Sequence, residues 1–403
     1  MLVHGPSPRL WRPTFSASRP YSSVTAVDSS RAISRFQRIA LDGTERERKK
    51  QQNSKMSTTA VIGGGIAGVT TSRLLSMLGE ASQLGRISLL DRGQRLGGRM
   101  SSRPINDQFT WNYGYQGIGV FDRLPPGARY LEGKERAEAL ALLGQAPGTT
   151  TLAVVAEQPM PVDALELPDG VDVRTKCNVV DIRRMEDKRW QLTYERESAT
   201  SQATFDRVII ADYTAATSLL GDAATSLVQR IHGVRYDPIF AYMARLSSAE
   251  GCRLATSAAA AGGLSTFSML RHGTNPPRVW GFTSRDTTMQ LLRDHPMESG
   301  GRVVPQTKEY RAAVARVLDA VISASGAQVV ESMCHRWGRG FPVNPIESES
   351  FVYDADLRLG VCGDMFRVDG TAPFDSAVRS AEALARHVID QTHVTSSQRP
   401  AKL

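Results

Sequence analysis

The sequence predicts an α/β fold in which a parallel sheet of the dinucleotide-binding type is joined to a second, antiparallel sheet. Three observations support this prediction. A strand, a glycine-rich turn, a helix and a second strand follow one another within residues 60–91. A buried strand near the C-terminus ends in a Gly-Asp pair at 363–364, and strand-like segments between 237 and 284 indicate the second sheet. Residues 56–403 exceed what one hydrophobic core usually serves, so two domains are expected.

The first segment has the order and spacing of a dinucleotide-binding βαβ unit. Residues 60–62 are a short apolar strand, residues 63–68 read G-x-G-x-x-G, and residues 69–78 carry leucines at helical spacing. A second strand at 87–90 then ends on Asp91. A glycine-rich turn alone is a weak signal, and a turn without a ligand is the alternative interpretation. The complete succession favours nucleotide binding.

Each glycine of the turn has a physical role in such a site. Gly63 permits the tight turn, Gly65 lets backbone amides approach a pyrophosphate, and Gly68 lets the helix pack closely on the strand. The diphosphate lies at the helix N-terminus, and the acid at the end of the second strand takes ribose hydroxyls and disfavours a 2′-phosphate. The predicted contacts in this unit are Gly63, Gly65, Ile66, Ala67, Gly68 and Asp91.

A basic, glycine-rich loop follows directly at residues 92–100. It resembles the R-x-G-G-R element of the flavin amine oxidase superfamily, in which glycines let the backbone pass close to FAD and arginines face its diphosphate. Arginine matches phosphate oxygens bidentately. The resemblance implies FAD as the cofactor, with contacts from Arg92, Gly98 and Arg99. A solvated basic loop is the alternative.

Residues 359–364 resemble the second FAD motif of the same superfamily. There the acid holds ribityl or diphosphate oxygens. The small-residue helix that follows, here 376–385, points its N-terminus at the flavin, where the helix dipole favours negative charge. The contacts implied here are Gly363, Asp364 and Ala377, with an ordinary strand-end aspartate as the alternative. The resemblance also implies a backbone contact from Val179 to the adenine.

The order of these motifs, with Cys334 to Pro342 between them, is similar to that of renalase-like flavoproteins over about residues 58–392. This resemblance implies a glutathione-reductase-like Rossmann FAD domain with an inserted antiparallel-sheet substrate domain. The expected segments are a transit peptide and disordered linker at 1–55, the FAD-binding domain at 56–120, 166–220 and 331–395, the substrate domain at 121–165 and 221–330, and a tail at 396–403.

The resemblance implies an FAD-dependent oxidoreductase. It would take a hydride from a small-molecule substrate, an isomeric dihydronicotinamide nucleotide, and pass electrons to O2. Two alternatives remain open. One is an amine or polyamine oxidase, although the lysine that such enzymes often carry near the flavin is absent from residues 328–345. The other is a flavin-binding protein without turnover, because Asn112 and Asp212 depart from the family pattern.

The segment around residue 335 is predicted to be a strand on the substrate side of the flavin. Alternate strand residues share a face, so His335 and Trp337 are expected on one side and Arg336 on the other. The tryptophan would stack on a nicotinamide or flavin ring, and the histidine would donate a hydrogen bond. The alternative is that both residues belong to the core.

Hydrophobic periodicity predicts several further elements. These are helices at 132–143 and 309–323, a hairpin built from 179–182 and 190–194, and a buried strand at 205–211. The aromatic, glycine-rich segment 109–119 either passes under the flavin or forms a hairpin in the core.

The first 55 residues differ in composition from the rest. Residues 1–41 hold six arginines, eight serines, no lysine and one acid, which is the pattern of an organellar transit peptide. We expect a plastid or mitochondrial protein, with a cytoplasmic product starting at Met56 as the alternative. Residues 1–55 contain 11 of the 49 basic and 4 of the 41 acidic residues, and so carry +7 of the net charge of +8. The body is nearly neutral and gives no case for a nucleic-acid partner.

Other partner classes are also disfavoured. No apolar run approaches the ~20 residues of a membrane helix, so we expect no membrane. The four cysteines, at 177, 252, 334 and 362, lack the spacing of zinc or redox sites, so no metal is expected. FAD is expected to be bound non-covalently, with a link to Cys362 left open. The expected partners are a small-molecule substrate and O2, and the sequence does not indicate an oligomeric state.

Overall fold

The chain divides into two units after Lys55, at the position where its composition changes. The computed structural model describes residues 57–79, 84–106, 109–112, 128–130, 154–156, 167–221, 224–248, 251, 264–270, 278–295, 307–368 and 373–397. The helix predicted at 132–143 and residues 113–119 of the aromatic segment lie outside these ranges.

A six-stranded sheet forms the centre of the unit Met56–Leu403. Its strands are β1 (Thr58–Ile62), β2 (Arg86–Leu90), β7 (Val171–Arg174), β11 (Arg207–Ile210), β16 (Val352–Asp354) and β17 (Leu359–Val361), in the spatial order β16-β17-β11-β1-β2-β7. All neighbours are parallel except β16, which pairs antiparallel with β17. Without β16 the order reads 3-2-1-4-5 along the chain, as in doubly wound dinucleotide folds. The predicted Rossmann-type α/β fold is therefore confirmed.

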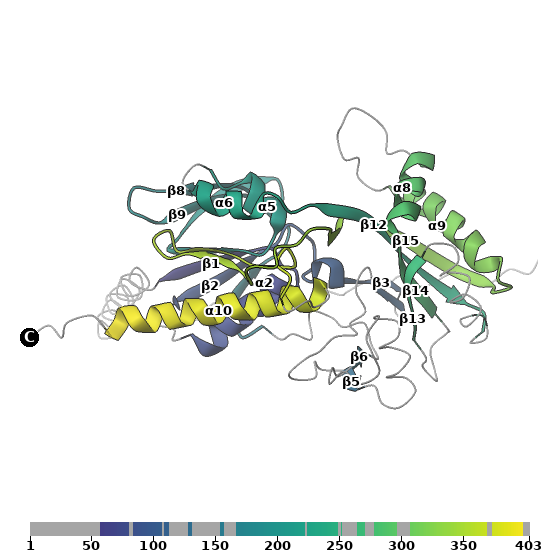
Figure 1. The fold of residues 1–403 in the computed structure, drawn as a ribbon, viewed down its shortest axis with the longest axis horizontal. Helices are drawn as coiled ribbons and strands as arrows, with labels where there is room; N and C mark the ends of the chain where they lie inside the picture. The colour runs from purple at the N-terminus through teal and green to yellow at the C-terminus, as the bar shows by residue number, and fades with distance from the viewer. Residues whose placement is uncertain are drawn as a thin grey trace, which may run out of the picture. The chain divides into compact units, whose positions relative to one another are not determined.

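Two helices cover one face of this sheet. They are α2 (Ile66–Leu78), which begins three residues before the predicted helix, and α10 (Pro373–Ser397), which contains the predicted helix 376–385 and extends beyond it. Figure 1 shows the two helices side by side along the sheet. Their buried side chains, including Leu75 and Leu384, form one core with the strands.

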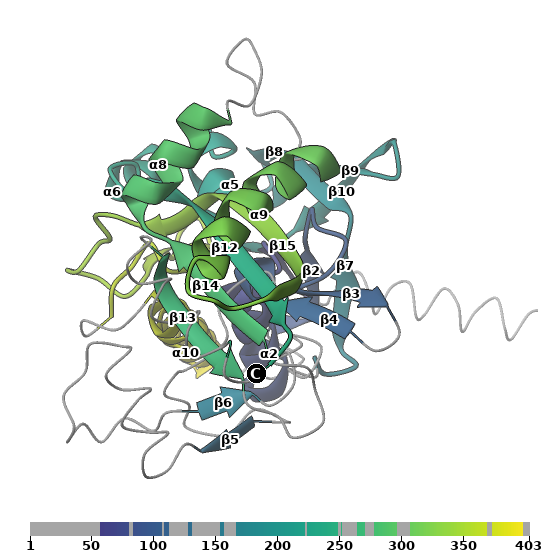
Figure 2. The ribbon, with the colours of Figure 1, turned by 90° about the vertical axis from the view of Figure 1, so that its right-hand side faces the viewer.

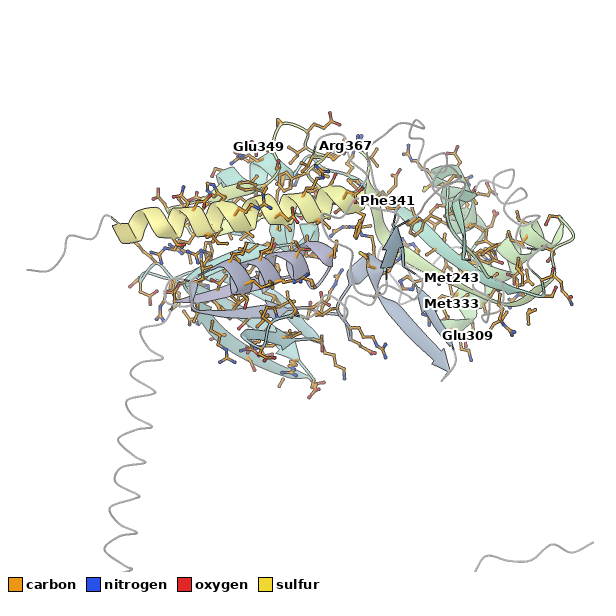
Figure 3. All side chains as sticks on the ribbon, turned by 90° about the horizontal axis from the view of Figure 1, so that it is seen from below. Met243, Glu309, Met333, Phe341, Glu349 and Arg367 are labelled. Atoms are coloured by element: carbon orange, nitrogen blue, oxygen red, sulfur yellow. The ribbon has the colours of Figure 1, made fainter. Side chains whose placement is uncertain are left out.

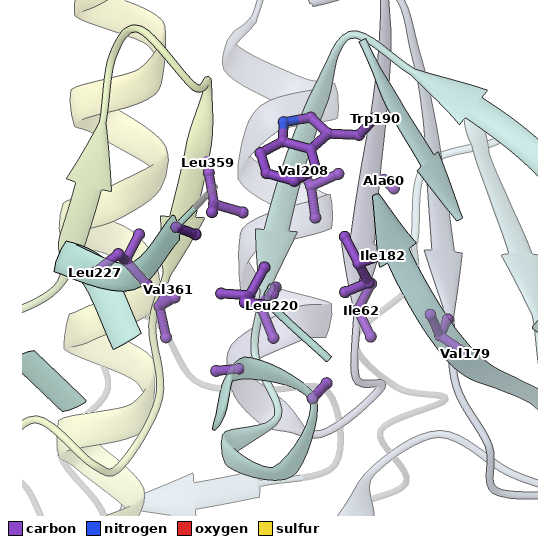
Figure 4. Close-up of a cluster of buried hydrophobic side chains, with 14 of the residues drawn as sticks. Ala60, Ile62, Val179, Ile182, Trp190, Val208, Leu220, Leu227, Leu359 and Val361 are labelled. Carbon is purple, nitrogen blue, oxygen red and sulfur yellow. The ribbon is translucent and has the colours of Figure 1, made fainter. Parts of the chain in front are cut away.

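A second layer covers the opposite face. It consists of the antiparallel strands β8 (Cys177–Arg184), β9 (Trp190–Arg196) and β10 (Ala199–Phe205) with the helices α5 (Tyr213–Ser218) and α6 (Thr225–Ile231). Trp190 is 1% exposed and packs among Val208, Ile182 and Leu359 in this core (Figure 4). Its indole nitrogen donates to the carbonyl of Leu357 at 2.8 Å, so the polar end of the ring is satisfied. The predicted hairpin at 179–194 is confirmed by β8 and β9.

The buried strand predicted at 205–211 is confirmed as β11 (Arg207–Ile210), but its predicted first residue, Phe205, belongs to another strand. Phe205 ends β10 opposite Trp190, and β11 begins at Arg207 beside β1. Between them the carboxylate of Asp206 accepts from the backbone nitrogen of Thr58 at 2.8 Å and from its hydroxyl at 3.0 Å. The β9–β10 turn has positive φ at 197 and 198 without glycine or asparagine, so it carried no hairpin signal in the sequence.

The second sheet is antiparallel and contains β12 (Tyr236–Leu246), β13 (Leu264–Leu270), β14 (Arg278–Thr283) and β15 (Val329–Pro342), in the order β13-β14-β12-β15. Helices α8 (Arg285–Asp294) and α9 (Lys308–Ser323) cover one face (Figure 2). Met243, Met333 and Phe341, labelled in Figure 3, belong to the other face. The predicted strands of this sheet and the helix at 309–323 are confirmed.

Two predicted segment boundaries need correction. Residues 331–342 were assigned to the FAD-binding segment, but they lie in β15, which pairs with β12 along its length. Residues 225–231 were assigned to the substrate segment, but α6 buries Leu227 and Ile231 in the core of the first sheet. A hydrophobic pattern indicates which face of an element is buried, but it does not indicate which sheet the element packs against. This explains both errors.

Two short strand pairs and one 3-10 turn complete the described chain. Strands β3 (Ser102–Asn106) and β4 (Phe109–Asn112) form an antiparallel pair, β5 (Ala128–Tyr130) pairs with β6 (Val154–Ala156), and Gly98–Met100 form a single 3-10 turn. Within the described residues, no helix is long and apolar enough to cross a membrane. The described side chains also contain no group of three His, Cys, Asp or Glu that could hold a metal ion.

Candidate functional site

Most of the lining of a cavity of about 1090 Å³ comes from four loops and one strand. The loops follow β1, β2, β11 and β17, and the strand is β15 of the second sheet. The predicted site residues among its lining are Gly63, Gly65, Ile66, Asp91, Arg92, Gly98, Arg99, His335, Trp337, Asp364 and Ala377. The cavity opens where strand order switches between β1 and β11, which is where doubly wound folds bind ligands.

The glycine turn after β1 has a distinct reason for each glycine. Gly63 has φ of +102°, which favours glycine. A Cβ on Gly68 would lie 1.8 Å from the carbonyl oxygen of Gly63, so only hydrogen fits where α2 crosses the turn. A Cβ on Gly65 would meet nothing within 4 Å, and Gly65 caps α2 without a side-chain hydrogen bond. The turn therefore presents backbone amides to an open space.

Asp91 connects the turn to the basic loop. One carboxylate oxygen accepts from the backbone nitrogen of Gly64 at 2.5 Å, and the other accepts from that of Gly93 at 2.6 Å. The side chain also lines the cavity. The acid therefore fixes the two loops on either side of it, a role that the sequence did not reveal. Its predicted ribose contact stays a prediction.

The arginines of the basic loop divide into two kinds. Arg92 and Arg95 are exposed at the cavity, whereas Arg99 is half-buried and turned toward β15. Gly97 and Gly98 both have positive φ, of 113° and 52°, so the glycine pair makes the turn that directs Arg99 inward. The amide of Gly97 donates to the carbonyl of Gly64 at 2.7 Å and ties this turn to the glycine turn after β1.

Arg99 and Asp364, 265 positions apart in the sequence, form an ion pair in which the acid is buried and the arginine half-buried. The Arg99 guanidinium Nη1 lies 2.7 Å from Asp364 Oδ2 and also donates to the carbonyl oxygen of Gly340 in β15. The other oxygen of Asp364 accepts from the Tyr236 hydroxyl at 3.1 Å. Burial lowers the pKa of the Arg99 guanidinium, but the Asp364 charge outweighs it and the net pKa is raised. Burial and Asp364 both raise the pKa of Tyr236, which keeps its proton.

His335 and Trp337 share one face of β15, as predicted. Their rings meet edge to face with centroids 4.5 Å apart. Phe282 and Phe341 add a second edge-to-face pair to the lining, at 5.2 Å. This aromatic wall lies on the side of the sheet away from α8 and α9. The aromatic wall could therefore pack against a planar ring of a ligand.

Arg336 points to the other face, also as predicted, and still lines the cavity. Its partner in the β12 register is Phe240, which belongs to the helix-covered core. Burial raises the pKa of Tyr310, and the charge of Arg336 counteracts this rise. The guanidinium of Arg336 therefore lies near α9, the helix that contains Tyr310. The cavity therefore follows both faces of β15 at its edge, a shape that strand alternation alone does not predict.

Four predicted contacts do not line the cavity among the described residues. Ala67 and Gly68 lie beneath the turn, and Val179 packs in the core of Figure 4. Gly363 has φ of +140° and donates its amide to the buried hydroxyl of Ser380 at 3.0 Å, so it shapes the turn before Asp364. The adenine contact of Val179 stays a prediction.

Cys362 is a poor candidate for a covalent flavin link. It is 0% exposed, contacts the Thr71 hydroxyl, and is absent from the described lining of the cavity. Burial raises the pKa of its thiol to about 12, so the reactive thiolate is scarce near neutral pH. The expectation of non-covalent binding is the one that this environment favours.

Sequence reasoning missed several residues of the lining. Tyr213, Tyr236, Arg311 and Arg339 come from four elements that no local motif joins. Tyr213 lies in α5, the helix that follows β11. Here the Asp212 carboxylate accepts from the Ala215 amide at 2.9 Å and caps the helix. This capping signal was readable in the sequence.

Comparison with known proteins extends the fold assignment. Residues 61–132 match the family of NAD(P)-binding Rossmann-like domains. The chain is similar to cyclohexylamine oxidase from Brevibacterium oxydans, with 11% identity, a TM-score of 0.51, and coverage of 84% of this chain and 100% of that one. The two chains share a fold.

Two further solved structures are similar at lower scores. A CLA-producing fatty acid isomerase from P. acnes has 13% identity and a TM-score of 0.48, covering 82% of this chain and 98% of that one. A p-nitrophenol 4-monooxygenase from Pseudomonas putida has 13% identity and a TM-score of 0.43, covering 84% and 81%.

Proposed function

We propose that this chain binds FAD non-covalently and acts as an FAD-dependent oxidoreductase. The observation that carries the proposal is that both predicted FAD motifs, from opposite ends of the body, line one cavity. A Cβ on Gly65 would meet nothing within 4 Å, so the start of α2 faces open space that a diphosphate would occupy. A cavity of about 1090 Å³ is large for a small-molecule site, for which ~300–1,000 Å³ is usual, and suits a dinucleotide with a second molecule beside it.

The residues of the cavity can be assigned to parts of the cofactor. The amides at the start of α2, with Arg92 and Arg95, would bind the diphosphate. Asp91 and Asp364 would accept from ribose and ribityl hydroxyls through their remaining lone pairs. Ala377 places the first turn of α10 at the cavity, where the helix dipole favours negative charge. When bound, FAD supplies hydride acceptance from the substrate and two-electron transfer to O2, which becomes H2O2.

For the substrate, we propose a renalase-like reaction on an isomeric dihydronicotinamide nucleotide. The described lining holds six arginines and three aspartates, and no lysine or glutamate. This excess of positive charge favours an anionic ligand. The aromatic wall of Trp337 and Phe341 suits a planar nicotinamide ring, and His335 would donate a hydrogen bond to its carboxamide.

The two alternatives make different demands on the cavity. An amine or polyamine oxidase binds a cation, which this arginine-rich lining would repel. A flavin-binding protein without turnover needs no substrate wall, whereas here His335 and Trp337 line the cavity beside the cofactor loops. Both alternatives remain testable by the same experiment.

The test is a visible absorption spectrum of the purified full-length chain, followed by anaerobic titration. We expect a flavin spectrum that is lost on denaturation and filtration. We also expect bleaching by isomeric dihydronicotinamide nucleotides, and none by primary amines or spermine. Bleaching by an amine would favour the amine oxidase alternative. A stable yellow protein that no candidate bleaches would favour a flavin-binding protein without turnover. A colourless protein that fails to bind added FAD would contradict the proposal.

Replacing Trp337 with alanine should weaken substrate binding and leave FAD bound. Loss of the ring contact should raise KM for the bleaching substrate roughly tenfold, about 1.4 kcal/mol. Flavin content and the melting temperature should stay close to those of the unchanged chain, because Trp337 is only half-buried. Trp337→Phe, which keeps a ring, should recover most of the affinity. Loss of folding, or no change in either kinetic constant, would favour the core interpretation of this residue.

For residues 1–55, we propose an organellar targeting role. A reporter fused behind these residues should enter mitochondria or plastids, and the chain 56–403 should keep its flavin and melting temperature. The measurement is fluorescence microscopy of the fusion beside a reporter fused at Met56. A cytosolic pattern for both fusions would contradict the targeting role.

A further inference from the structure

Arg99 occupies a junction between the two sheets. Its loop follows β2 in the first sheet, and its guanidinium Nη1 donates both to Asp364 Oδ2 at 2.7 Å and to the carbonyl of Gly340 in β15. One cationic nitrogen therefore joins the basic loop, the second FAD motif and the strand that carries Trp337.

The same acid is held from the second sheet as well. Tyr236 begins β12, lies opposite Pro342 at the end of β15, and donates its hydroxyl to Asp364 Oδ1 at 3.1 Å. Asp364 is 7% exposed, so its charge depends on these two donors in place of water. Gly340 is also buried, and a Cβ there would lie 2.5 Å from Ile239, so this end of β15 is packed tightly against β12.

Within the described part of the chain, the other arginines of the loop make no such contacts. Arg92 and Arg95 line the same cavity, but their side chains are exposed, and the described residues give neither an ion pair. The resemblance implied that Arg99 faces the diphosphate with its neighbours. Its geometry instead directs its charge to the acid and to the substrate strand.

We propose that Arg99 is a positioning residue that couples the cofactor loop to the end of β15. The inference rests on the proposed binding of FAD. Ordering of the loop at residues 97–100 by the diphosphate fixes the guanidinium, and the guanidinium fixes the Gly340 carbonyl and hence the segment from Trp337 to Gly340. Because coupling between sites is reciprocal, loosening this junction also weakens FAD binding.

The test is amide hydrogen exchange of residues 335–342 in the full-length chain with and without FAD, beside the FAD dissociation constant. In the unchanged chain, FAD should slow exchange in this segment at least tenfold. In Arg99→Met, saturating FAD should slow amide exchange in this segment less than twofold. Arg99→Lys should restore most of the effect, because an ammonium can donate to both Asp364 Oδ2 and the Gly340 carbonyl oxygen. Arg95→Met is the matched control: it should weaken FAD binding and keep the full slowing once FAD is saturating.

The possible outcomes separate the coupling from the proposed binding of FAD. Equal slowing in Arg99→Met and the unchanged chain would overturn the coupling while leaving FAD binding intact. Failure of the unchanged chain to bind FAD would contradict the proposed function and the coupling together. If Arg99→Met does not fold, Tyr236→Phe and Arg99→Lys carry the test. Tyr236→Phe removes one donor to Asp364 and should reduce the slowing several-fold, and full slowing in that variant would overturn the proposal.

Discussion

A Gly65→Val variant should fold normally and fail to retain FAD. Gly65 has φ of −69° and ψ of 178°, a conformation that valine adopts readily, and its Cβ would project into open space. The cost to folding is about 1 kcal/mol, from a poorer helix cap. The added methyls would occupy the place of the pyrophosphate at the N-terminus of α2. We expect colourless protein with an FAD dissociation constant raised at least a hundredfold, measured by flavin fluorescence.

Gly233→Val is the matched control. A Cβ on Gly233 also meets nothing within 4 Å, but this residue lies in the turn after α6 and is absent from the cavity lining. It should bind FAD like the unchanged chain. Recovery of fully yellow Gly65→Val protein would show that the diphosphate does not lie at this turn.

A Gly68→Ala variant should lose stability even without FAD. The new Cβ would lie 1.8 Å from the Gly63 carbonyl oxygen, and neither that backbone atom nor the start of α2 can move without opening the turn. Overpacking commonly costs 1–3 kcal/mol, and a clash with backbone belongs at or above the upper end, about 3 kcal/mol. Urea unfolding of the cofactor-free protein should show the loss as a lower midpoint.

Gly65→Ala is the comparison for this effect, since the same methyl is added three residues earlier in open space. Its free energy of unfolding should stay within about 1 kcal/mol of that of the unchanged chain. If Gly68→Ala unfolds at the same urea concentration as Gly65→Ala, close packing of helix on turn is not the reason for this glycine.

The sequence predicted the cofactor turn because its determinants are local. Residues 58–91 form strand, turn, helix and strand in direct succession. The restriction at Gly63 is its positive φ, and the restriction at Gly68 is the carbonyl oxygen of Gly63, five positions away. The same holds for His335 and Trp337, whose common face follows from strand geometry alone. In both cases the spacing of residues along the chain was enough to predict the local geometry.

Pairing between distant segments was not predictable in this way. The strand with His335 was placed with the wrong sheet, because an alternating pattern fits any partner of suitable polarity. The hairpin of β9 and β10 was missed because Glu197 and Ser198 adopt positive φ without the residues that usually signal it. Neither the order of strands nor the membership of a sheet is encoded in a short window.

The sequence by itself determined the Rossmann turn, the two motifs predicted to bind FAD and the alternation of residues 335–337, because each depends on residues near one another in the chain. Only the tertiary structure decided that Arg99 turns away from Arg92 and Arg95 to bind Asp364 and the Gly340 carbonyl. It likewise decided that Asp91 holds two loops and that Arg336 reaches the cavity from the far face of β15. The physical reason is that a charged side chain removed from water takes the partner that the fold brings within reach, and that partner is set by packing across the whole unit.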